Sequence, residues 1–192
     1  MRRRLAARER GAVLVETVVV LPLVLLLVFG IVEWSAAYHD SSVTADAARA
    51  GGRIASAQAR NPDFATNAAA SVAAALSTLP ASSPQEMWIY KVDQSTTGGY
   101  PFGNTTGFNT CSTSCIKYTW NSSTKQFNTS TPQGGGWAST DQQVCQEPFD
   151  QIGIYVKIRH DFVTHIFGAS ITLSDHSVFR FEPTPSASCA SS

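Results

Sequence analysis

The chain has 192 residues and a formal net charge of zero, a length that suits one modest domain plus a membrane helix. The charge is unevenly placed: five arginines and one glutamate before residue 12 give a net charge of +4, so the remainder carries −4. An arginine cluster is also found in nucleic-acid-binding proteins. Directly before an apolar span it is far more typical of a topology signal, so no nucleic-acid partner is expected.

Residues 12–32 form an apolar run whose only charged side chain is Glu16. At about 1.5 Å of rise per residue, a helix of this length crosses a hydrocarbon core of about 30 Å. The basic flank predicts a cytoplasmic amino terminus, with everything after the span outside the cell membrane. The alternative is a cleaved secretory signal ending at Ser35-Ala36-Ala37, but the run is longer than the apolar region of such signals and contains Glu16.

Glu16 is the fifth residue after Gly11, and an ionisable group inside a span is a functional hypothesis by default. If the chain is cut after Gly11, Ala12 carries a new α-amino group, and Glu16 can pair with that amine on a neighbouring copy. Basic leader, small residue, apolar run and glutamate together resemble a prepilin-type signal. The alternative is an ordinary anchor whose Glu16 reaches back to the interface.

Residues 33–59 are predicted to continue the same helix, so the helical segment covers 12–60. A stripe of mostly small residues recurs at steps of three and four, which permits close helix approach. Its members are Trp34, Ala37, Tyr38, Ser41, Ala45, Ala48, Gly52 and Ala55. Trp34 and Tyr38 fit an aromatic belt at the outer interface. The stripe packs either on its own domain or also against other subunits.

This amino-terminal block resembles the TadE-like family, pseudopilins of the bacterial tight-adherence (Tad) pilus machinery. The matching features are Gly11 before Ala12, Glu16, Leu21-Pro22, Gly30-Ile31-Val32-Glu33 and Ala47-Ala48-Arg49-Ala50-Gly51. The resemblance implies a structural, minor component of pilus biogenesis and adhesion. The implied partners are the lipid bilayer, a prepilin peptidase, other pseudopilins and the Tad secretion platform. The rival function is a membrane-anchored extracytoplasmic binding module unconnected with a pilus.

Residues 61–183 are predicted to form a small extracytoplasmic domain. A helix starts at Asn61-Pro62-Asp63 and stops before Pro80, and alternating apolar residues predict strands at 87–92, 152–158 and 171–181. The last strand ends in an Arg-x-Glu-Pro pattern that resembles the end of TadE-like proteins. The fold class is therefore α+β: a long amino-terminal transmembrane helix followed by a domain with an antiparallel sheet.

A polar tract at 93–143, rich in Thr, Ser, Asn and Gly, interrupts this domain. It is expected to be a surface insertion with little core of its own, apart from one hairpin at 116–127. Residues 184–192 form a tail of small side chains, and residues 1–11 form the basic leader.

Four cysteines, Cys111, Cys115, Cys145 and Cys189, lie beyond the span. An even count on the outward side favours disulfides. Three pairings are possible; we favour Cys111–Cys115 and Cys145–Cys189. A metal site is not expected, because no second close pair of ligands follows Cys115.

No catalytic residue is predicted. The sequence has no Gly-x-Ser-x-Gly elbow, and Gly134-Gly135-Gly136 is followed by Trp137 rather than by the Lys and Ser/Thr of a phosphate-binding loop. No enzyme activity and no cofactor are therefore expected.

Overall fold

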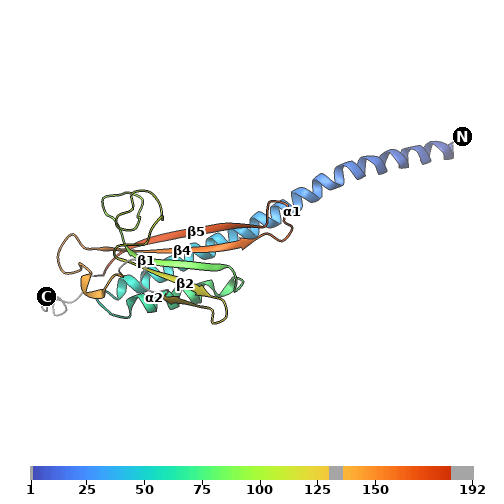
Figure 1. Cartoon of the computed structure of the whole chain (residues 1–192). Helices are drawn as coiled ribbons and strands as arrows, with labels where there is room; N and C mark the ends of the chain where they lie inside the picture. Colours follow the sequence, from blue (N-terminus) through green and yellow to red (C-terminus); the bar gives the residue numbers. More distant parts are fainter. Residues whose placement is uncertain (1, 130–135, 183–192) are drawn as a thin grey trace.

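The computed structural model describes residues 2–129 and 136–182, with side chains from Val13 onward. Within these residues, one long helix precedes a domain in which helices cover one face of a five-stranded antiparallel sheet (Figure 1), which confirms the α+β class. The sheet order is β3-β2-β1-β4-β5. The elements are α1 (Arg2–Ala57), α2 (Phe64–Ala75), β1 (Pro84–Lys91), β2 (Cys115–Asn121), β3 (Gln126–Thr129), β4 (Gln151–Asp161) and β5 (Ser170–Arg180), with 3-10 turns at Leu76–Thr78 and Ser139–Asp141.

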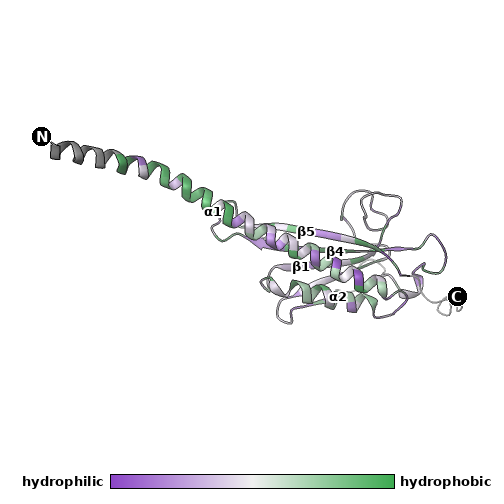
Figure 2. Cartoon of the chain, turned by 180° about the vertical axis from the view of Figure 1, so that it is seen from behind, coloured by the Kyte–Doolittle hydropathy of each residue, from purple (hydrophilic) through white to green (hydrophobic). Residues whose placement is uncertain are grey.

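Helix α1 is continuous from the leader to the domain. It includes Gly11 and Pro22 without a break and ends at Ala57, three residues before the predicted limit. Its amino-terminal half projects away from the domain (Figure 1), and most of the coloured residues in this half are hydrophobic (Figure 2). From Val13 to Val32 nearly every side chain is exposed. Exposed apolar surface on this scale is what a membrane span presents to lipid.

The second half of α1 packs on its own domain, against α2, β4 and β5. The contact uses small residues: Ala47, Ala48 and Ala55 are buried, and Gly51 and Gly52 allow a closer approach. A Cβ atom built on Gly51 would lie 2.5 Å from Val72 Cγ2. The end of the small-residue stripe, Ala48, Gly52 and Ala55, is thus packed within the subunit, whereas its start at Trp34 and Tyr38 is exposed.

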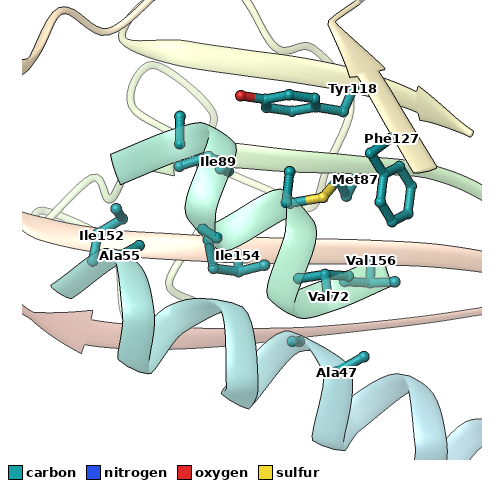
Figure 3. Close-up of a cluster of buried hydrophobic side chains, with 14 of the residues drawn as sticks. Ala47, Ala55, Val72, Met87, Ile89, Tyr118, Phe127, Ile152, Ile154 and Val156 are labelled. Atoms are coloured by element: carbon teal, nitrogen blue, oxygen red, sulfur yellow. The ribbon is translucent and has the colours of Figure 1, made fainter. Parts of the chain in front are cut away.

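The main core lies between the helices and the sheet (Figure 3). Alternate residues of β4 point toward the helices, as the periodicity predicted, and Met87 and Ile89 of β1 join them. Val72 of α2 packs over this layer. The four buried aliphatic residues of β4 on this face are Ile152, Ile154, Val156 and Ile158. Burying each such aliphatic side chain stabilises the fold by about 1.5–3 kcal/mol.

The polar tract supplies more of the core than expected. Its hairpin forms β2 and β3, whose Tyr118 and Phe127 are buried in the main core (Figure 3). Trp137 is buried as well and packs edge-on against Phe64. Tyr118 and Phe127 belong to the predicted hairpin, whereas Trp137 stands elsewhere in the polar tract, so local composition does not indicate its burial.

The other face of the sheet is also covered. Trp88, Tyr90 and Tyr155 form a second cluster beneath the loop between β1 and β2, whose Phe108 stacks on Tyr155 with ring centroids 4.3 Å apart. A disulfide between Cys111 and Cys115 closes this loop beside the cluster. The loop thus acts as a lid over strands that periodicity alone predicts to be exposed on this side.

Candidate assembly site at the membrane span and its junction

The proposed processing and assembly residues lie in the free half of α1. Gly11 and Ala12 are part of the helical backbone, and their side chains lie outside the part of the chain that is described. The Glu16 side chain is exposed among apolar neighbours. Next to it, Thr17 donates its hydroxyl to the Val13 carbonyl at 2.8 Å. Glu16 is thus open to a partner outside the subunit.

Glu33, the first residue beyond the span, joins α1 to the loop between β4 and β5. It is 2% exposed, and its carboxylate accepts backbone N–H bonds from Val163 at 3.1 Å and from Thr164. These donors, the Thr164 amide foremost, hold the pKa of Glu33 below its usual value of 4.5. The carboxylate is therefore a fixed anionic anchor for the loop.

Aromatic rings complete this junction. Trp34 lies against Phe162 and Phe167, with ring centroids 6.1 and 6.2 Å apart. Trp34 is still 53% exposed and Tyr38 is 77% exposed. The β4–β5 loop thus places two further aromatic rings beside Trp34, and the aromatic belt stays a prediction.

A second polar contact lies about two turns further along α1. His160 Nδ1 is 2.6 Å from Asp40 Oδ2, and the His160 ring packs edge-on against Phe162. His160 is buried, and its Nε2 atom has no hydrogen-bond partner among the described residues. An acid–histidine pair resembles part of a hydrolase triad, but a catalytic histidine needs a nucleophile or substrate at its second nitrogen. The pair instead ties β4 to α1.

Sequence reasoning missed these junction contacts. The sequence marks Glu33 only as part of the Gly30-Ile31-Val32-Glu33 motif, and nothing in it links Asp40 with His160. Their partners lie 120 to 131 residues away in the chain, so helical periodicity carries no trace of them. The one available signal was the charge of Glu33 directly after an apolar run.

The cysteines follow part of the predicted pattern. Cys111 and Cys115 are joined, with Cα atoms 5.3 Å apart. Cys145 is disulfide-bonded, and Cys189 lies outside the described residues. Across residues 13–129 and 136–182, no three potential ligands gather to hold a metal ion.

Comparison with known proteins gives one match. Residues 11–53 match the family model described as TadE-like protein. No curated protein and no solved structure gave a match. The matched block runs from the free half of α1 through Glu33 and Asp40 and stops within the segment that packs on the sheet. It therefore includes the helical side of the junction and none of the strands.

Proposed function

Since residues 11–53 match the TadE-like family, we propose that this protein is a membrane-anchored pseudopilin, a minor structural component in the biogenesis of a Tad pilus and in adhesion. One observation carries the proposal: the exposed apolar run of the matched block, residues 12–32, holds a single carboxylate, Glu16, five residues after Gly11. An exposed apolar helix of this length is unfavourable in water, whereas a subunit held in a bilayer requires one.

The anchoring follows from the length and composition of α1. One amino-terminal helix is long and apolar enough to cross a membrane. The five arginines before Ala12 favour a cytoplasmic amino terminus and an extracytoplasmic domain. The protein is therefore a single-pass component of the cell membrane.

Glu16 gives the span its role in assembly. An unpaired carboxylate costs at least about 2.5 kcal/mol at the centre of a bilayer on insertion scales. Cleavage after Gly11 by a prepilin peptidase removes the basic leader and creates an amine at Ala12. Glu16 of one subunit then pairs with that amine on a neighbouring pseudopilin, which couples processing to incorporation at the Tad secretion platform.

The proposed role is structural, not catalytic. The match to a TadE-like family favours it. The burial of His160 against Asp40 also fits a structural contact between β4 and α1.

Amino-terminal sequencing of protein purified from membranes tests the processing step. The mature chain should begin at Ala12, and Gly11→Leu should retain the leader while the protein stays inserted. Glu16→Ala should leave insertion and cleavage intact but reduce co-purification with other pseudopilins. Thr17→Ala, one residue away, is the matched control and should behave as the native protein.

Two results would contradict this mechanism. A mature terminus at Met1, or at Tyr38 after ordinary signal cleavage, removes the processing step. Normal piliation by the Glu16→Ala protein removes the role of the carboxylate, whatever the position of the cut.

A further inference from the structure

The loop between β4 and β5, residues 162–169, is an unusually apolar surface loop. Val163 is 85% exposed, Ile166 47% and Phe167 43%. The loop contains no Asp, Glu, Lys or Arg, and its only titratable side chain is His165. Two charges lie close by on β4, Arg159 and Asp161, and they pair with each other at 2.9 Å. The buried Glu33 carboxylate faces the backbone of the loop, where it accepts the Val163 and Thr164 amides. Solvent-facing loops are ordinarily polar, so these exposed side chains call for a partner.

The loop is fixed at one height on α1. A Cβ atom built on Gly30 would lie 3.3 Å from the Phe167 ring, so the ring touches the helix inside the span. Glu33 holds the Val163 and Thr164 amides, and Trp34 packs between Phe162 and Phe167. Figure 1 shows the loop lying beside α1 where the helix leaves the domain.

This height coincides with the edge of the bilayer. Gly30 lies two residues before the end of the apolar run, which is about 3 Å of helix rise. A ring in contact with Gly30 is therefore at the level where the hydrocarbon core gives way to the interface. Exposed aliphatic and aromatic side chains at that level fit the acyl–headgroup boundary, where amphipathic surfaces bury their apolar face.

From this placement we propose that the β4–β5 loop dips into the outer leaflet, with Val163, Ile166 and Phe167 in contact with lipid. The protein then has two membrane contacts, the span and the loop, which are joined by the hydrogen bonds from the Val163 and Thr164 amides to Glu33. The inference rests on the proposed membrane anchoring. A second copy of the chain is the rival occupant. Lipid is favoured because the loop is continuous with the span and lies level with its end.

Site-specific photo-crosslinking tests the proposal with the full chain in vesicles of phosphatidylethanolamine and phosphatidylglycerol. p-Benzoylphenylalanine replaces Val163, or in a second variant Ile166. Both side chains are exposed, so the fold should tolerate the change. Phe102 is the matched control, because it is 44% exposed, close to the 47% of Ile166. It follows the end of β1 that pairs with the start of β4, whereas the tested loop follows the end of β4. Leu23, 65% exposed within the span, reports anchoring itself.

Mass spectrometry after irradiation should find lipid adducts at positions 23, 163 and 166, several-fold above position 102. Adducts at 23 with none above the control level at 163 and 166 would overturn the loop contact while leaving the anchoring intact. Crosslinks from 163 to a second copy in place of lipid would also overturn it. No lipid adduct even at 23 would refute the anchoring on which the inference rests.

Discussion

Glu33 combines burial, charge and two backbone donors in one side chain. Replacing it with Gln keeps the shape but removes the negative charge that the Val163 and Thr164 amides face. Hydrogen bonds to an ionised acceptor are roughly twice as strong as neutral ones. We therefore expect Glu33→Gln to lower the melting temperature of the full chain in detergent at pH 7, and Glu33→Ala to lower it further.

The effect of Glu33 should depend on pH. Because its folded-state pKa is below the ordinary value of 4.5, the ionised carboxylate stabilises the fold above that pH. This contribution is lost as the pH falls through the folded-state pKa, so the difference between native protein and Glu33→Gln should shrink below pH 4.5. Exposed Glu182, changed to Gln, is the control; a pH-independent difference at position 33 would contradict the assignment.

Gly153 is a position where only hydrogen fits. A Cβ atom there would lie 2.1 Å from the Tyr90 ring, which is itself held by a hydrogen bond from its hydroxyl to the Gly99 carbonyl at 2.9 Å. Overpacking of this kind costs about 1–3 kcal/mol. Gly153→Ala should lower the free energy of unfolding by that amount in a denaturant titration. In a Tyr90→Ala background the same change should cost much less; equal costs would exclude the steric cause.

At the level of elements, the packing of α1 on the domain depends on glycine. Alanine in place of a helical glycine ordinarily stabilises by about 1 kcal/mol. At Gly51 the added methyl group would meet Val72 Cγ2 at 2.5 Å, so Gly51→Ala should destabilise instead. Exposed Ser42→Ala on the same helix is the control and should be neutral or slightly stabilising.

A smaller side chain at Val72 on α2 should relieve the clash with a methyl group at position 51. Val72→Ala alone should destabilise the domain by about 1–3 kcal/mol, because it removes buried methyl groups. Combined with Gly51→Ala, it should cost less than the sum of the two single changes. Additive losses in urea titrations would show that the two side chains do not share one contact.

Sequence periodicity predicted most of these elements because it records which face of a helix or strand is buried. The alternation in residues 152–158 identified β4 and its inward face. The same alternation does not indicate that the opposite face of β4 is covered too, where Phe108 of the β1–β2 loop stacks on Tyr155. Likewise Trp137 lies in a polar tract, and its burial depends on distant Phe64. Asp40 and His160 are 120 residues apart in the chain, so no local pattern records their contact.

At the scale of the whole molecule, the property to test is the orientation of the chain in the membrane. Alkaline phosphatase fused to the carboxyl terminus should be active, because an arginine flank before a span favours a cytoplasmic amino terminus. A green fluorescent protein fused after Met1 should fluoresce in the cytoplasm. Changing Arg2, Arg3, Arg4, Arg8 and Arg10 to Gln should weaken this orientation. An inactive phosphatase fusion in the native chain would contradict it.

Helix α1 continues from the span into the domain without a break. A change in bilayer thickness that tilts the span would therefore also change the orientation of the domain. Residues 33–57 extend about 37 Å beyond the span at 1.5 Å per residue. Transmembrane helices tilt by about 20° on average and tilt more in thinner bilayers, and that average angle swings the far end of this segment by about 13 Å. With the span in a bilayer as proposed, a change in bilayer thickness would therefore tilt α1 and the sheet packed on it together.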